Sequence, residues 1–154
     1  MYNHAPSGYD CFVCRLVAGD SDAAIVVAES ERAIAIVSSR VWGSSPGHVL
    51  VLPERHVENI YDLDDDDALV VHRLTRRVAI GLKEALACDG VSTRQHNEPA
   101  GGQDVWHYHV HVFPRYVRDG LYGSSPRDST LKERRAFAER LRPALQEAER
   151  DEAP

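Results

Sequence analysis

Three histidines at alternate positions are the clearest candidates for chemistry in this chain. His107, His109 and His111 lie in residues 106–115, where the interleaved aromatic and β-branched residues are typical of a β-strand. Because successive side chains of a strand point to opposite faces, the three imidazoles are expected to share one face. The opposite face, expected to meet the core, carries Trp106, Tyr108, Val110 and Val112. Burying unpaired imidazoles costs free energy, so the pattern favours a metal site or phosphoryl chemistry over a chance cluster or a terminal tag.

A second candidate site is the pair Cys11-x-x-Cys14, which supplies half of a tetrahedral zinc site or, equally, a redox pair. No second pair of this kind and no nearby histidine pair completes it, so further ligands would have to come from distant parts of the chain. Cys88 makes the number of cysteines odd. A cytoplasmic protein with a metal or free thiols therefore fits the sequence better than a disulfide framework.

The composition narrows the function classes. The chain has 154 residues, of which 43% are hydrophobic, enough for the core of one ordinary domain. A formal net charge of −6 argues against binding to a nucleic-acid polymer or to an anionic membrane surface. No apolar run in the sequence approaches the roughly 20 residues of a membrane span, and the first residues lack the pattern of a secretion signal. We expect a cytoplasmic protein with a small ligand.

The expected elements form an α+β domain with an antiparallel sheet. Strands are predicted where β-branched and aromatic residues gather, at residues 24–28, 33–37, 48–52, 91–95 and 106–115. A short helix is predicted at residues 10–19. The domain boundaries are expected to give a flexible N-terminal arm at 1–8, the main domain at 9–120, and a connection and helix at 121–154.

Two longer helices are predicted to cover the sheet. The first, at residues 65–87, begins with an acidic run that complements the helix dipole. Its apolar stripe consists of Val70, Leu74, Val78, Leu82 and Leu86. The second follows a capping box at Thr130–Glu133 and is expected to kink or restart near Pro143.

The histidine segment resembles the signature of the histidine triad (HIT) family, His-φ-His-φ-His-φ-φ with φ apolar, in residues 107–113. Further landmarks of the family match at Gly102-Gln103-Asp104-Val105, Pro114-Arg115-Tyr116, Pro46-Gly47-His48-Val49-Leu50 and Arg55-His56. The resemblance covers roughly residues 10 to 118. It implies nucleotide hydrolases and nucleotidyl transferases acting on phosphorus, with a sheet of about five antiparallel strands, two main helices, and a homodimer whose sheets join.

The resemblance also implies roles for individual residues. His109 would attack the α-phosphorus of a purine nucleotide and form a covalent nucleotidyl-histidine, which water or another acceptor releases. His111 would donate to the phosphate or leaving group, and His48 and His107 would complete the catalytic histidines. Dinucleoside polyphosphates and nucleoside phosphoramidates are the candidate substrates. The residues expected to contact them are Asn97, Gly102 and Gln103.

Zinc is implied by the same resemblance. Similar bacterial family members bind a structural zinc ion through positions that are filled here by Cys11, Cys14, His56 and His107. A closed site of this kind would be structural, because catalytic zinc keeps an open position. In the alternative interpretation, His56 is merely exposed and His107 only orients His109.

Two departures from the family pattern bear on the substrate. Asp104 stands where many members have serine or threonine, and an ionised aspartate cannot donate a hydrogen bond to phosphate. Ser38 and Ser39 stand where an acidic residue often grips the ribose hydroxyls. These departures keep open the alternative of a nucleotide-binding regulatory module with little turnover. A purely metal-binding protein is a weaker hypothesis, because it does not explain Gln103 or His48.

Overall fold

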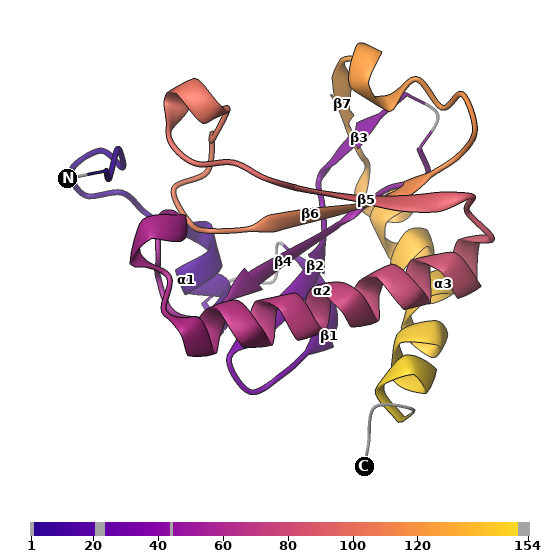
Figure 1. Cartoon of the computed structure of the whole chain (residues 1–154), viewed down its shortest axis with the longest axis horizontal. Helices are drawn as coiled ribbons and strands as arrows, with labels where there is room; N and C mark the ends of the chain where they lie inside the picture. The colour runs from indigo at the N-terminus through magenta and orange to yellow at the C-terminus, as the bar shows by residue number, and fades with distance from the viewer. Residues whose placement is uncertain (1, 21–23, 44, 151–154) are drawn as a thin grey trace.

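The computed structural model describes residues 2–20, 24–43 and 45–150, and its main element is a five-stranded antiparallel sheet (Figure 1). The strands, in spatial order, are β1 (Ile25–Glu29), β2 (Ala33–Val37), β4 (Val49–Pro53), β6 (Val110–Arg115) and β5 (Gly90–Gln95). The expected α+β fold with about five antiparallel strands is therefore confirmed. Among the described residues, no helix has the length and apolar composition that a membrane span needs.

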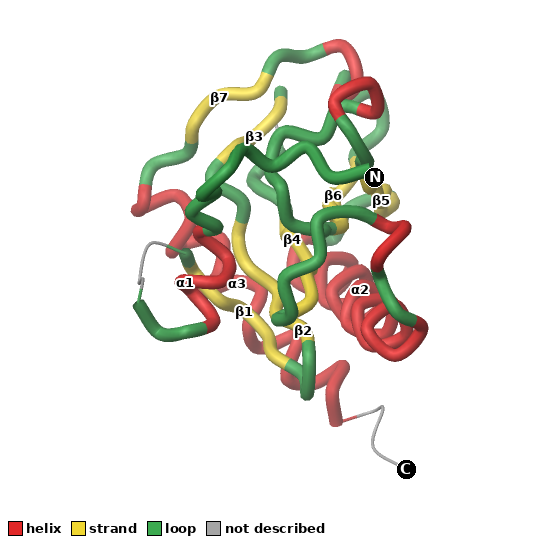
Figure 2. The backbone as a smooth tube through the Cα atoms, turned by 90° about the vertical axis from the view of Figure 1, so that its left-hand side faces the viewer, coloured by secondary structure: helices red, strands yellow, loops and turns green. Residues whose placement is uncertain are grey.

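Helices cover the two faces of the sheet unequally (Figure 2). They are α1 (Phe12–Val17), α2 (Asp65–Leu86) and α3 (Leu131–Arg150). Alternate residues of β2 show the division, because Ala35 and Val37 belong to the core beneath α2 and α3, whereas Ile34 and Ile36 pack in the cluster around α1. The short helix α1 covers only part of its face, so the remainder of that face is available for a site.

The first main helix, α2, forms as the sequence predicts. Asp64 caps its N-terminus by accepting a hydrogen bond from the backbone N–H of Asp67 at 2.8 Å, and the acidic first turn complements the helix dipole. The helix ends at Ala87, which adopts the left-handed conformation. Leu74 and Val78 of the expected stripe are buried in the core.

The second main helix, α3, begins with the expected capping box. The N–H of Glu133 donates to the hydroxyl of Thr130 at 3.2 Å, and the N–H of Thr130 donates to the carboxylate of Glu133 at 2.7 Å. Of the kink or restart expected near Pro143, the restart does not occur, because one helix runs from Leu131 to Arg150. Buried Leu141 and Leu145 pack in the core on either side of the proline and offset its missing hydrogen bond.

The histidine segment is only partly a strand. β6 begins at Val110, so His107 and His109 precede the sheet instead of lying within it. The backbone N–H of Tyr108 donates to the carbonyl of Val57 at 2.6 Å, which directs this stretch toward the turn after β4. Strand pairing with β4 and β5 then starts at Val110.

A separate two-stranded ribbon joins distant segments beside the sheet. It pairs β3 (Arg40–Trp42) with β7 (Pro126–Asp128). The sequence predicts only a loop at residues 38–47, because three residues are too few for a recognisable alternating pattern. The ribbon fixes the position of Arg40 and Trp42.

Candidate active site and metal centre

A cavity of about 280 Å³ occupies the part of the sheet face that α1 leaves uncovered. Its floor contains a row of paired residues, in which His111 on β6 lies opposite Leu50 on β4 and opposite Arg94 on β5. Directly opposed residues of antiparallel strands project to the same face. Further residues lining the cavity come from α1, from β3 and the residue before it, and from the loop before β6. They include Phe12, Ser39, Arg40, Trp42, Gly102 and His109.

His109 lines this cavity as a defined neutral tautomer. Its Nδ1 lies 2.7 Å from the carbonyl oxygen of His107, and because a carbonyl only accepts, Nδ1 carries the proton. The lone pair of the neutral ring is therefore on Nε2. Burial lowers the pKa of His109, against the opposing effect of the bond to His107. The ring is accordingly neutral at pH 7 and has the electronic form of a nucleophile.

His48 and His111 form a hydrogen-bonded pair beside His109. Nε2 of His48 lies 3.0 Å from Nδ1 of His111, and the rings of His109 and His111 are 4.9 Å apart. Phe113 stacks on both members of the pair, 4.2 Å from His48 and 5.6 Å from His111 between ring centroids. Burial, followed by the nearby His109, lowers the pKa of His48 to about 3 and that of His111 to about 2. The expected histidines His48, His109 and His111 are thus brought together.

His107 lies apart from them and does not line the cavity. Its Nε2 is 2.9 Å from the carbonyl oxygen of Pro53, so this nitrogen carries the proton. Nδ1 then presents its lone pair to the sulfur of Cys11 at 3.3 Å. The side chain of His107 therefore belongs to a cysteine–histidine cluster, while its backbone carbonyl belongs to the active-site cluster.

The cysteine–histidine cluster fits a tetrahedral metal site. The ligand atoms of Cys11, Cys14, His56 and His107 all lie within 4.8 Å of one another. Zinc bonds of about 2.3 Å to sulfur and 2.0–2.1 Å to nitrogen require ligand atoms about 3.3–3.8 Å apart. The Cys11–His107 and Cys14–His56 separations are both 3.3 Å, and both thiols are free. The bond from His107 to Pro53 is the kind of outer contact that orients a metal-bound imidazole.

The three residues expected to bind substrate occupy different positions. Gly102 lines the cavity and has a φ of +87°, a conformation that favours glycine. Gln103 is buried, and its amide donates to the carbonyl of Glu58 at 2.6 Å. The side chain of Asn97 accepts a hydrogen bond from the N–H of Ile60 at 2.8 Å. Gln103 and Asn97 thus anchor the loop that carries Gly102, and direct contact with substrate stays a prediction for all three.

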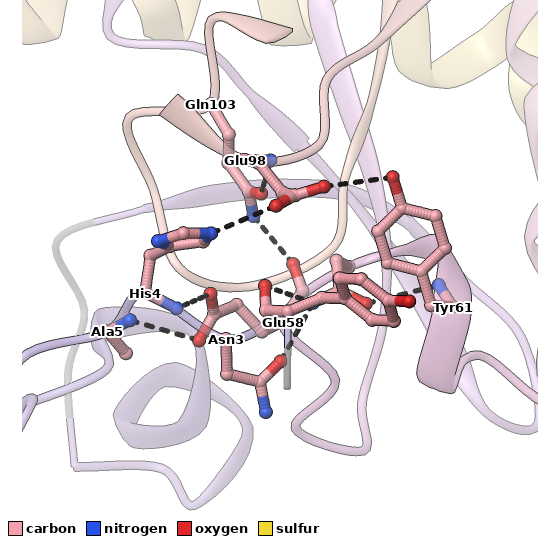
Figure 3. A network of polar contacts seen from close by, with 9 residues as sticks. Asn3, His4, Ala5, Glu58, Tyr61, Glu98 and Gln103 are labelled. Carbon is pink, nitrogen blue, oxygen red and sulfur yellow. Dashed lines mark hydrogen bonds and ion pairs between the residues drawn. The ribbon is translucent and has the colours of Figure 1, made fainter. Parts of the chain in front are cut away.

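The N-terminal segment, for which we expected a flexible arm, is hydrogen-bonded to this loop and its support (Figure 3). The backbone N–H groups of His4 and Ala5 donate to the carboxylate of Glu58. Glu98 lies 3.1 Å from the imidazole of His4 and accepts from the hydroxyl of Tyr61 at 3.0 Å. The contacts with His4 and Tyr61 lower the pKa of Glu98. Glu98 has a φ of +61°, a strained value for a residue with a side chain, and its backbone N–H donates to the side chain of Gln103 at 2.8 Å.

Several cavity residues were not singled out from the sequence as site residues. Arg40 on β3 pairs with Asp104 at 3.1 Å, which neutralises the carboxylate that departs from the family pattern. The pair is exposed and contributes little stability. His96 donates from Nδ1 to the carbonyl of Gly101 at 2.7 Å. Arg94 resembles any arginine of a half-exposed strand, and only strand register places it opposite His111.

Comparison with known proteins identifies relatives over most of the chain. The profile of the HIT domain matches residues 21–118. The Protein hit of Bacillus subtilis is 33% identical over 115 residues, which are 75% of this chain and 77% of that protein. Adenylylsulfatase HINT3 of Arabidopsis thaliana is 28% identical over 127 residues, which are 80% of this chain and 61% of that protein.

A solved structure agrees with the fold over nearly its full length. A Zn-bound histidine triad family protein from Mycobacterium smegmatis superposes with a TM-score of 0.79 at 30% identity, covering 93% of this chain and 98% of that one. The domain match spans well over half of the sequence and includes all three triad histidines. On these grounds the chain belongs to the HIT domain family.

Proposed function

We propose that this protein is a nucleotide hydrolase or nucleotidyl transferase that acts at an α-phosphate through a covalent nucleotidyl-histidine. The observation that carries the proposal is the hydrogen bond from Nδ1 of His109 to the carbonyl of His107, because it leaves the lone pair on Nε2. The name of the Arabidopsis relative, an adenylylsulfatase, agrees with cleavage next to an adenylyl group. Phe12 and Leu50 give the cavity an apolar side suited to a purine base.

The reaction then proceeds in two displacements. Nε2 of His109 attacks the α-phosphorus, and the bond from phosphorus to the leaving group breaks. His48 and His111 share one proton between Nε2 and Nδ1; when His48 donates it, His111 carries its own proton on Nε2 and can donate a hydrogen bond from it to the departing atom. Water or another acceptor next attacks the phosphorus, which releases the nucleotide and restores His109.

A regulatory module that binds nucleotide with little turnover is the second candidate. Ser38 and Ser39 line the cavity, and their hydroxyls would hold ribose less tightly than a carboxylate. Multiple-turnover rates with a panel of adenosine phosphoramidates and dinucleoside polyphosphates distinguish the enzyme from the regulatory module. A module would release less than one product molecule per protein chain over the assay.

Replacing the nucleophile tests the covalent mechanism. His109→Ala should lower turnover by several orders of magnitude and abolish the nucleotidyl adduct. Mass spectrometry of reactions quenched in denaturant at alkaline pH should detect the adduct in the wild type, because the phosphorus–nitrogen bond is labile in acid. His72→Ala, an exposed substitution on α2, is the matched control and should retain both. Wild-type turnover by a folded His109→Ala protein would refute the mechanism.

The burial of His48 predicts a pH dependence of stability. An unfolded histidine has a pKa of about 6.5, whereas that of His48 in the folded chain is about 3. Below pH 6.5 the unfolded state binds a proton that the folded state does not, so the free energy of unfolding falls as the pH drops toward 3. His48→Gln should remove roughly 2 kcal/mol of the loss between pH 7 and pH 5, measured by urea unfolding.

His72→Gln is the control for this measurement, because His72 is exposed on α2. It should retain the pH dependence of the wild type. The zinc ligands are unchanged in both variants, so the difference between His48→Gln and the wild type isolates His48. An identical pH dependence in these two proteins would contradict the assignment.

We further propose that the cysteine–histidine cluster holds one structural zinc ion per chain. Cys11→Ser should lose most of the metal and lower the melting temperature, because α1 loses its tether to His107. Its effect on catalysis should be smaller than that of His109→Ala, whereas His107→Ala should lose metal and activity together. Cys88→Ser, a buried cysteine outside the cluster, should keep its zinc. Metal analysis that finds no zinc in the wild type, or full zinc in Cys11→Ser, would overturn the site.

The open edge of the sheet supports a homodimer. In the described part of the chain, β5 pairs with β6 on one side and with no strand on the other. Such an edge is a template for pairing with a second copy. Light scattering at micromolar concentration should give about twice the chain mass of 17.2 kDa. A mass equal to one chain would exclude this assembly.

A further inference from the structure

Arg94 defines a second side of the cavity. Strand register places His111 between Leu50 on β4 and Arg94 on β5, and all three residues line the cavity. The side toward Leu50 is apolar and includes Phe12 of α1. The side toward Arg94 is cationic. The histidines of the reaction therefore separate two subsites of opposite chemical character.

The guanidinium of Arg94 lacks the partners that a buried arginine normally has. Its Nε and Nη2 are buried without a hydrogen-bond acceptor among the described residues. Its central carbon lies 4.2 Å from the ring centroid of Tyr122 and 5.1 Å from that of Phe113. Aromatic rings stabilise the flat face of a guanidinium but leave the N–H groups at its edge unused. A buried donor without an acceptor is costly, and Arg94 lines the cavity, so its charge is left for an anion that a ligand brings.

The charges around the cavity point to an anionic ligand. Two arginines line the cavity, and Arg40 is paired with Asp104. No carboxylate of the described residues pairs with Arg94.

The direction of the reaction determines which part of a substrate meets Arg94. In phosphoryl transfer the leaving atom departs opposite to the attacking atom. With the base on the apolar side near Leu50, the leaving group extends past His111 toward Arg94. His96 also lines this region, but its Nδ1–H is already bonded to the carbonyl of Gly101, so Nε2 donates only when the ring is protonated. On this side of the cavity, Arg94 carries a permanent positive charge, which His96 does not.

We propose that Arg94 forms a subsite for an oxyanion leaving group, a phosphate chain or a sulfate, and so selects nucleotide anhydrides over nucleoside phosphoramidates with an uncharged amine. This inference rests on the proposed function and specifies its substrate class. The nucleotide is transferred to Nε2 of His109, the anhydride oxygen takes the bonding electron pair, and the departing oxyanion is stabilised by the positive charge of Arg94. Arg94 here contacts only the leaving group.

The test compares two substrates with the same adenylyl group. Diadenosine tetraphosphate has a polyphosphate leaving group, and adenosine 5′-phosphoramidate releases ammonia. Arg94→Gln should lower the ratio of kcat/KM for the first to kcat/KM for the second by at least about tenfold, as expected for lost hydrogen bonds between charged groups. Arg94→Lys should restore part of the ratio, because it keeps the charge without the planar fork. Arg73→Gln, an exposed substitution on α2, should leave the ratio at the wild-type value.

The outcomes separate this inference from the proposed function. Wild-type protein that neither turns over nor forms the adduct with either substrate would overturn the proposed function and the subsite together. A normal wild type with an unchanged ratio in Arg94→Gln would overturn the subsite alone, including the case in which both rates fall equally because the variant is less stable. Melting curves of both Arg94 variants show how much folded protein enters each rate.

Discussion

The hydrogen bond from Nδ1 of His109 to the carbonyl of His107 is the interaction on which the site depends. It fixes the tautomer of the histidine that faces the cavity, and it does so with a backbone atom, which cannot change its protonation state. That carbonyl is itself held in place because the side chain of the same residue is bonded on two sides, to Pro53 and to Cys11. One residue thereby links the cysteine–histidine cluster to His109, the proposed nucleophile. The shape of the cluster and the chemistry of the cavity are mechanically coupled.

The end of β4 and the turn that follows it hold the segment before β6 in place. Carbonyls at the end of β4 and in the turn after it accept from the segment before β6 at three points: Pro53 from His107, Val57 from Tyr108, and Glu58 from Gln103. These bonds replace the strand pairing that the segment lacks. The carboxylate of Glu58 also binds the N-terminal residues, so the same turn holds both the arm and the loop that carries Gly102. A short stretch of chain therefore positions the cysteine–histidine cluster and the edge of the cavity.

Burial of the histidines has a chemical consequence. His48, His109 and His111 lie close together, and three charged imidazoles at these distances would repel one another in a medium of low polarity. Desolvation lowers their pKa values and keeps the cluster neutral. Phe113 helps to exclude water by stacking beneath the pair. A neutral cluster can supply a nucleophile and donate a hydrogen bond, with the positive charge supplied by Arg94 at the side of the cavity.

Local patterns in the sequence were sufficient for the elements that bury one face. The stripe of α2, the capping box of α3 and the apolar strands β2 and β4 follow from periodicity and capping, which are properties of short stretches. The position where β6 begins was not predictable in this way. Alternating residues from His107 onward indicate a strand, but the carbonyl of Val57 takes the N–H of Tyr108 and delays sheet pairing to Val110. A competing partner from a distant turn leaves no local signal.

By itself, the sequence determined the kinds of residues available for chemistry: three alternating histidines, a cysteine pair, and a resemblance that assigned each a role. The tertiary structure alone decided which of these residues join the cysteine–histidine cluster and which line the cavity. It brought His56 and His107 to the cysteines, and His48 to His111, through contacts between segments far apart in the chain. It also placed Arg94 beside the histidines, although nothing in its neighbourhood in the sequence distinguishes it. Strand register and long-range hydrogen bonds set these distances, and neither is encoded in the spacing of residues along one segment.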